Sequence, residues 1–300
     1  GGPAPLYFAD EDRAQRNTVA LKDVDYLIEA HFTFTEKKGS DDKSMFNSGT
    51  FLSMKMRNIG PAYMSGRIAD IAVDQNNPST WYTAVGSSGV WKTVNAGTTW
   101  TPIFDKQSVY STGDVTIDPS NSNIIWVGTG ENNGGRHISF GDGVYKSIDG
   151  GKTWKNMGLK ESERISDIII HPTNSNIVWV SAQGPLWTSG GERGLYKTTD
   201  GGATWKQVLK PADEWTGVTS LLIDPRNPDR LYAATWSRQR TIASYVGTGP
   251  GAGIHTSTDG GETWTELKTG LPAGNMGKIG MAISPTNPDV LYATIETDNR

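Results

Sequence analysis

The chain has 300 residues, a formal net charge of −4, 36 glycines and 11 tryptophans, a composition typical of many short strands joined by tight turns. It has no basic stripe, which argues against nucleic acid as a partner. It contains no cysteine, which excludes disulfides and thiolate chemistry. We expect no metal or other cofactor, because the four histidines lack metal-site spacing, and no membrane span, because no apolar stretch is long enough.

The first part of the chain does not share the pattern of the rest. Residues 1–45 are polar and charged, and we expect an extended arm with one strand at 26–35, where apolar and polar residues alternate. A second short strand is expected at 51–59, just before Gly60 and Pro61. We interpret the arm as separate from a repeat domain that covers residues 46–300.

One eight-residue pattern, Ser/Thr-x-Asp/Asn-x-Gly-x-Thr-Trp, occurs four times, at 93–100, 147–154, 198–205 and 257–264. Copies spaced by roughly 50–60 residues indicate a repeated supersecondary unit. The Asp or Asn can accept backbone N–H groups in a tight turn, the glycine allows positive φ, and the Trp can cover the turn. The pattern is identified as the Asp-box, and we interpret its residues as structural: Asn95, Trp100, Asp149, Trp154, Asp200, Trp205, Asp259 and Trp264.

Each repeat predicts four antiparallel strands. An apolar strand comes first, followed by an Asn/Pro turn, an aromatic strand, a strand that begins at glycine, the Asp-box, and a fourth strand beginning at its Trp. The first strands are expected at 68–73, 115–117, 165–170, 218–223 and 279–283. The sequence therefore predicts an all-β fold, a β-propeller with four full blades and half of a fifth. We expect it to be the N-terminal part of a larger propeller, because an unclosed one exposes strand edges.

Antiparallel alternation places the Asp-box and Asn/Pro turns on one face of the blades and the second-to-third strand loops on the other. These loops are minimal in the first repeat, at 86–88, and long in the next three, at 129–142, 182–193 and 235–252. Insertions on one face of a repeat array usually mark a binding surface, although solvated loop side chains remain the alternative. The candidate ligand-binding residues are Glu131, Arg136, His137, Asp142, Trp187, Arg193, Trp236, Arg238, Arg240 and Tyr245.

Three successive first strands carry an aspartate at the equivalent position: Asp70, Asp114 and Asp167. Such carboxylates could surround the axis of the propeller and provide the acid/base pair of a glycoside hydrolase. Alternatively, each could be a buried tie to the next blade's backbone or to Arg67 or Arg164. We favour the structural interpretation because the position repeats.

From about Met56 onward the chain resembles bacterial Asp-box propellers related to the sortilin (Vps10) luminal domain and to xyloglucanase-type glycoside hydrolases. The resemblance is carried by residues 57–61, 65–67 and 90–100 and by the repeated Asp-Pro-x-Asn-Pro turns. The sortilin relationship implies a secreted or surface-exposed binding propeller without catalysis. The xyloglucanase relationship implies two catalytic aspartates between two complete propellers. Sialidases fit poorly, because their Phe/Tyr-Arg-Ile-Pro strand is absent.

We therefore predict an extracytoplasmic binding or scaffold propeller, a component of a surface assembly, that recognises a protein or a glycan through its long loops. The alternative is a glycoside hydrolase that acts on polysaccharide with a pair of the three aspartates, so enzyme activity stays open.

Overall fold

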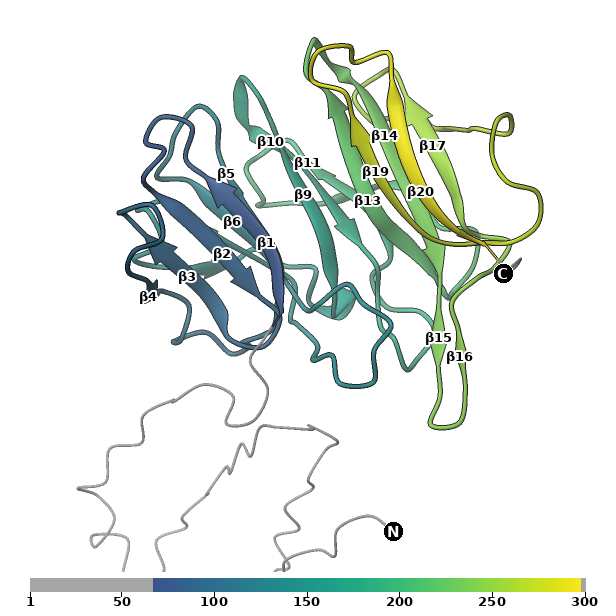
Figure 1. The fold of residues 1–300 in the computed structure, drawn as a ribbon, viewed down its shortest axis with the longest axis horizontal. Helices are drawn as coiled ribbons and strands as arrows, with labels where there is room; N and C mark the ends of the chain where they lie inside the picture. Colours follow the sequence, from purple (N-terminus) through teal and green to yellow (C-terminus); the bar gives the residue numbers. More distant parts are fainter. Residues whose placement is uncertain (1–66, 298–300) are drawn as a thin grey trace, which may run out of the picture. The chain divides into compact units, whose positions relative to one another are not determined.

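The computed structural model describes residues 67–297, so the expected arm and the strands at 26–35 and 51–59 lie outside the described residues. The described part is almost entirely β, with one short 3-10 turn, η1 (Lys160–Ser162). It contains four four-stranded antiparallel sheets and two strand pairs, β15 (Gln239–Arg240) with β16 (Tyr245–Val246) and β19 (Met276–Ile283) with β20 (Leu291–Thr297) (Figure 1). The all-β propeller architecture is confirmed, with four complete blades and two strands of a fifth within these residues.

Each blade follows chain order from its inner to its outer strand. Blade one contains β1 (Ile68–Val73), β2 (Trp81–Val85), β3 (Gly89–Thr93) and β4 (Thr101–Pro102). Blade two contains β5 (Thr112–Ile117), β6 (Ile125–Thr129), β7 (Val144–Ser147) and β8 (Lys155–Asn156). Blade three contains β9 (Ile165–His171), β10 (Asn174–Ala182), β11 (Gly194–Thr198) and β12 (Lys206–Leu209).

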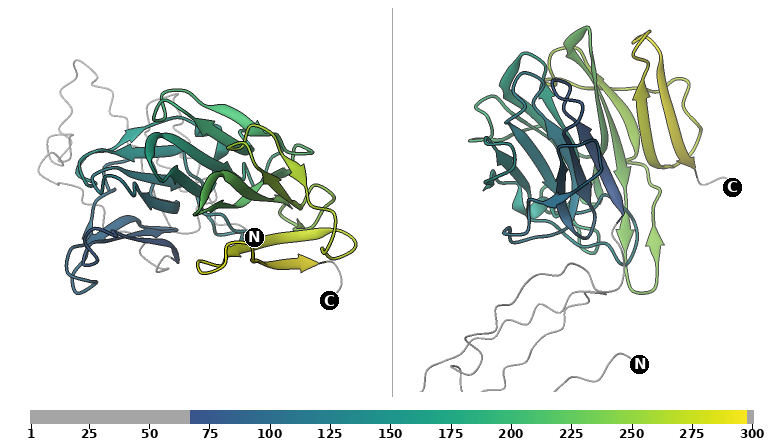
Figure 2. Two further views of the ribbon diagram at one scale, coloured as in Figure 1. Left: turned by 90° about the horizontal axis from the view of Figure 1, so that it is seen from above. Right: turned by 60° about the vertical axis from the view of Figure 1, so that its left-hand side comes forward.

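Blade four contains β13 (Thr216–Asp224), β14 (Asn227–Ser237), β17 (Gly253–Ser257) and β18 (Thr265–Glu266). Between β14 and β17 the chain forms a small hairpin, β15 (Gln239–Arg240) and β16 (Tyr245–Val246). The fifth blade begins with β19 (Met276–Ile283) and β20 (Leu291–Thr297). The inner strands β1, β5, β9, β13 and β19 contact one another in that order, and from above the sheets follow an arc (Figure 2).

The apolar core lies between blades. One buried cluster joins Tyr82, Val90 and Phe104 of blade one to Val115 and Tyr145 of blade two. Equivalent clusters join blades two and three, three and four, and four and five. Each blade therefore buries its apolar face only against its neighbours, as expected for a repeat protein.

The Asp-box turns are closed by their own side chains. In blade two, Asp149 Oδ1 accepts hydrogen bonds from the backbone N–H groups of Lys152 (3.0 Å) and Thr153 (2.9 Å). Ser147 Oγ accepts from Gly151 N at 2.9 Å, where the backbone has a φ of 86° that glycine adopts without strain. The turns at 198–205 and 257–264 repeat these bonds.

The fourth strands begin one residue later than predicted, and in blades two and three the Asp-box tryptophan bonds to the preceding blade. Trp154 donates its Nε1–H to the Ile103 carbonyl at 2.9 Å and packs edge-on against Phe104, with ring centroids 5.3 Å apart. Only at Lys155 does the chain pair with β7. Trp154 therefore joins two blades rather than only covering its own turn.

The preceding blade also holds each of these turns from the other side. Lys92 Nζ donates to the Gly150 carbonyl at 2.9 Å, and the Tyr82 hydroxyl donates to the same oxygen at 3.3 Å. Two blades further on, Trp179 Nε1 donates to the Gly260 carbonyl at 3.0 Å. The Asp-box is thus a recurrent joint between blades.

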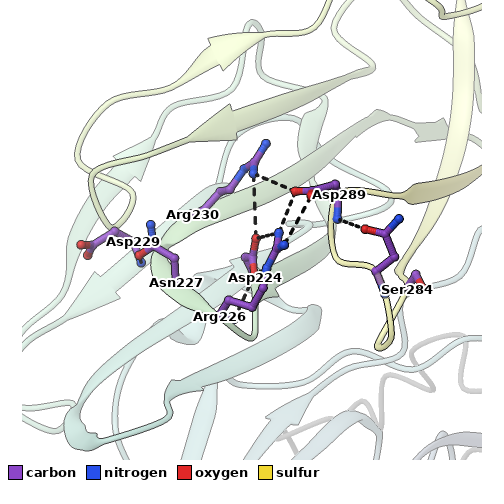
Figure 3. Close-up of polar contacts among 8 residues, drawn as sticks. Asp224, Arg226, Asn227, Asp229, Arg230, Ser284 and Asp289 are labelled. Atoms are coloured by element: carbon purple, nitrogen blue, oxygen red, sulfur yellow. Dashed lines mark hydrogen bonds and ion pairs between the residues drawn. The ribbon is translucent and has the colours of Figure 1, made fainter.

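Ion pairs join the turns of blades four and five on the same face. Arg226 Nη2 lies 2.9 Å from Asp224 Oδ2 and 2.7 Å from Asp289 Oδ1 (Figure 3). Arg230 lies farther away, 3.7 Å from Asp289 and 3.9 Å from Asp224. This face is therefore occupied by contacts that hold the blades together.

The Asp-box carboxylates make the free energy of unfolding depend on pH in the acid range. Hydrogen bonds from Thr153, and then from Ser147, lower the pKa of Asp149 to about 2, and equivalent bonds lower those of Asp200 and Asp259. Unfolded aspartate titrates near 3.9, so this stabilisation is complete above about pH 4 and is lost as pH falls through the folded-state pKa values. We expect urea unfolding to show a steep stability loss between about pH 4 and pH 2. Asp149→Asn should make this loss of stability less steep. Asp105→Asn, which changes an exposed aspartate outside the Asp-box turns, should leave it unchanged.

Candidate functional site

The three long loops meet on the face opposite the Asp-box turns. We call them loop two (130–143), loop three (183–193) and loop four (238–252). Arg240 joins all three, because its Nε donates to the Gly134 carbonyl at 2.7 Å and its backbone N–H donates to the Leu186 carbonyl at 3.1 Å. Together they form one continuous surface, which we call the loop face.

Loop two extends much farther than its own blade. Its residues 131–134, which we call the strap, begin with Glu131 in a two-bond ion pair with Arg67, at 2.5 Å for each bond. The next residue, Asn132, donates to Thr219 Oγ1 on β13 at 3.0 Å and accepts from Lys278 Nζ on β19 at 2.8 Å. The strap therefore connects the start of blade one with the inner strands of blades four and five.

Four of the predicted ligand-binding residues are exposed on the loop face. Trp187 is 42% exposed and Tyr245 is 39% exposed, and Arg136 and His137 are also exposed. His137 Nε2 lies 2.5 Å from Arg67 Nη1, so its ring is held beside the strap. These side chains are in position to contact a ligand.

The exposed apolar residues Phe140 and Ile242 were missed by the sequence reasoning. Ile242 is 87% exposed and lies between β15 and β16, in the hairpin that extends past the other strands of its blade (Figure 1). The sequence signal for Ile242 is an apolar side chain within a loop insertion, whereas the prediction named only aromatic and charged residues. The loop face therefore presents more apolar surface than expected.

Four other predicted residues, Glu131, Arg193, Trp236 and Arg238, are buried. Arg193 donates five hydrogen bonds to backbone carbonyls, four of them within residues 183–190 and one at Trp215. Trp236 donates to the Gly247 carbonyl at 2.7 Å, inside loop four. Because their polar groups are used internally, these side chains shape the loops and lie outside the exposed surface.

Asp142 and Arg240 are half-buried and have internal partners. Asp142 Oδ2 accepts from the Ser108 hydroxyl at 2.5 Å and from the Tyr145 hydroxyl at 2.8 Å, which anchors the end of loop two. The Arg240 guanidinium lies 4.5 Å from the centre of the Tyr245 ring, a cation–π contact. Arg240 thus supports the exposed Tyr245.

Asp70, Asp114 and Asp167 lie on the inner strands, each next to a shift in strand register. Such a β-bulge redirects a side chain. Asp70 Oδ2 accepts from the Val115 N–H at 3.2 Å, and Asp167 Oδ2 accepts from the Leu221 N–H at 2.7 Å. In both cases the donor belongs to the inner strand of the next blade, which is the geometry of a blade-to-blade tie.

The inner aspartates also interact with one another. Burial, followed by the negative charges of Asp70 and Asp167, raises the pKa of Asp114 well above its usual range. Burial raises the pKa of Asp167 to about 7, although the Leu221 N–H opposes that shift. A carboxyl group that keeps its proton near neutral pH can act as a general acid as well as a tie.

The raised pKa of Asp167 gives a second pH dependence, opposite in sign to that of the Asp-box. The folded protein holds this proton to about pH 7, whereas the unfolded chain releases it near 3.9. The associated stability is therefore complete below about pH 4 and is lost as pH rises through 7. Asp167→Asn keeps a side-chain oxygen that can accept the Leu221 N–H. We expect the unfolding free energy of the Asp167→Asn variant, measured by urea unfolding, to change less between pH 5 and pH 8 than that of wild type.

The described residues contain neither a candidate metal cluster nor a candidate membrane-spanning helix. Among residues 67–297, no group of three or more His, Asp or Glu side chains could hold a metal ion. Within the same range, no helix is long and apolar enough to cross a membrane.

The family model for sortilin-Vps10, described as sortilin, neurotensin receptor 3, matches residues 142–297, just over half of the chain. The chain belongs to the sortilin-Vps10 family. This sortilin-Vps10 chain is also 24% identical, over 76% of its length, to a probable oligoxyloglucan-reducing end-specific xyloglucanase of Neosartorya fischeri, of which it covers 31%. It is 26% identical, over 65% of its length, to a xyloglucanase of a Paenibacillus species, of which it covers 17%.

Among solved structures, an ancestral GH74 enzyme superposes on the sortilin-Vps10 chain with a TM-score of 0.55 and 18% identity. The match covers 79% of this chain and 32% of that enzyme, and at this identity it shows the shared fold alone. The chain spans less than a third of the length of the curated relatives it matches.

Proposed function

We propose that the chain is an extracytoplasmic binding or scaffold propeller, a component of a surface assembly, that recognises a protein or glycan through its loop face. One observation carries the proposal: three loops from different blades contact one another and form one surface. Trp187, Tyr245 and Ile242 are exposed on that surface. Aromatic side chains on a rigid framework suit both sugar stacking and peptide anchoring. Membership of the sortilin-Vps10 family supports a binding role.

The opposite face supports this assignment by contrast. Its Asp-box carboxylates, glycines and tryptophans are used in bonds within and between blades. A ligand that engaged these groups would have to displace contacts that hold the propeller together. Single apolar side chains such as Ile148 are exposed on the Asp-box face too, whereas the loop face brings together exposed Phe140, Trp187 and Tyr245 from loops of three blades, and we therefore place binding there.

We expect Trp187→Ala and Tyr245→Ala each to weaken ligand binding by about 1–3 kcal/mol, the range for interface anchors, without changing the melting temperature. The ligand would come from a glycan array that includes xyloglucan oligosaccharides and from a phage-displayed peptide library, with affinity measured by titration calorimetry. Ile148→Ser is the matched control, because Ile148 is 70% exposed on an Asp-box turn. Loss of binding in the control alone, or no ligand in either library, would contradict the proposal.

A glycoside hydrolase is the second candidate. It is favoured by similarity to xyloglucanases and by the raised pKa values of Asp114 and Asp167, which a general acid requires. We expect no release of reducing sugar from xyloglucan by this chain, since the inner aspartates tie the blades together. Turnover by wild type that disappears in both Asp114→Asn and Asp167→Asn, with folding intact, would establish the hydrolase instead.

A further inference from the structure

Three arginines are buried together where loops three and four meet the blades: Arg164, Arg193 and Arg238. Arg238 is 1% exposed, and the charges of Arg164 and Arg193 both act on it. Burial, followed by these like charges, holds the pKa of Arg238 well below its usual range. Concentrated positive charge inside a protein is costly unless it is paired with anions.

The carboxylates near this cluster bond to cations other than Arg238. Glu131 makes both of its bonds to Arg67, and Glu163 bonds Arg164 Nη1 at 2.7 Å. Among the described residues, the Arg238 guanidinium donates only to the backbone carbonyls of Asn133 and Gly184. Carbonyl oxygens are neutral, so the full charge of Arg238 has no bonded counter-ion.

Two buried guanidinium donors also lack acceptors. The Nε atoms of Arg164 and Arg238 are fully buried and have no hydrogen-bond partner in the described part of the chain. A buried N–H of a charged group without an acceptor is uncommon in proteins and costs more than a neutral one. It therefore points to an anionic acceptor for this cluster.

Lys278 places this cluster within reach of solvent. Its Nζ lies 5.4 Å from the Trp236 ring, and the Arg238 guanidinium lies 5.0 Å from the same ring. The two cations also bind consecutive carbonyls of the strap, at Asn132 and Asn133. Lys278 is exposed, whereas Arg238 is buried, so a ligand would meet Lys278 first. Asp167, Glu131 and Glu296 partly offset the charge of Lys278, so the cationic excess centres on Arg238.

We propose that Arg164, Arg238 and Lys278 form a site beneath the strap for a single oxyanion, a carboxylate or a sulfate group. The inference rests on the proposed function, because the oxyanion would belong to the ligand of the loop face. It narrows that ligand to molecules with an acidic group. Guanidinium groups suit such oxyanions because their planar donors match the spacing of the oxygen atoms.

The test measures thermal unfolding and calorimetric binding with sodium sulfate and sodium acetate, each against sodium chloride at equal ionic strength. We expect saturable stabilisation of wild type by at least one oxyanion beyond that of chloride. Acetate binding would indicate a carboxylate ligand, and binding of sulfate alone a sulfate-type ligand. Stabilisation by both no greater than by chloride would overturn the proposal.

Substitutions test whether the oxyanion binds at this cluster. Lys278→Gln should weaken oxyanion binding by about tenfold, the loss expected from one charge-assisted contact. Arg238→Gln should abolish it, and if that variant fails to fold, the exposed Lys278 still tests the site. Arg226→Gln on the Asp-box face is the matched control and should bind normally. Equal oxyanion binding by Lys278→Gln and wild type would overturn the proposal. If Trp187→Ala loses the loop-face ligand while Lys278→Gln keeps it, the oxyanion site fails but the proposed function stands.

Discussion

Trp126→Ala is expected to lower the free energy of unfolding by about 3–5 kcal/mol, the range for truncation of a fully buried tryptophan. The Trp126 side chain is fully buried on β6 and packs edge-on against Trp205, with ring centroids 6.1 Å apart. Lys146 Nζ lies 4.9 Å from the ring and donates to the Gly201 carbonyl in the next Asp-box. The substitution therefore removes core packing and the support of a joint between blades. Urea unfolding followed by tryptophan fluorescence measures the loss.

Two other tryptophans serve as graded controls. Trp154 is half-buried and bonds to blade one, so Trp154→Ala should cost less, about 2 kcal/mol. Trp187 is exposed on the loop face, and Trp187→Ala should change stability by no more than about 0.5 kcal/mol. Equal losses for all three substitutions would contradict the packing described between the blades.

Arg193→Ala is expected to destabilise the protein by about 3 kcal/mol, because it leaves several buried carbonyls without donors. The guanidinium donates to Gly190, Gln183, Trp215, Pro185 and Thr188. We expect loop three to lose its order first, which faster hydrogen exchange of residues 183–193 would show. Arg193→Lys should rescue little, because an ammonium group cannot reproduce the planar fork of donors.

Arg136→Ala is the matched control for this prediction, since Arg136 is exposed on loop two. Its substitution should leave both stability and hydrogen exchange in loop three unchanged. If Arg193→Ala behaves like Arg136→Ala, the internal role assigned to Arg193 is wrong.

The repeat made the architecture predictable because its signals are local. An Asp-box turn needs an acceptor, a glycine with positive φ and a tryptophan within eight residues, so each copy indicates a strand pair independently. What the pattern could not show was the partner of Trp154, whose indole binds a carbonyl 51 residues earlier. The fourth strand of blade two pairs from Lys155, one residue later than predicted.

The loop face was predictable in position but not in detail. Loop length indicated where it lies, whereas the burial of Arg238 depends on Asn133, 105 residues earlier in the chain. The same holds for the strap, since Lys278 and Asn132 are 146 residues apart. Contacts between loops of different blades leave no periodic signal, so the exposed and internal members of the predicted set could be separated only in three dimensions.

Hydrogen exchange of the protein with and without a ligand from the array or peptide library tests the central claim most directly. If the loop face binds and the Asp-box face holds the blades together, the ligand should slow exchange in residues 130–143, 183–193 and 238–252. Exchange in the Asp-box turns at 93–100, 147–154, 198–205 and 257–264 should stay the same. Protection confined to the Asp-box turns, with the three loops unaffected, would contradict the account.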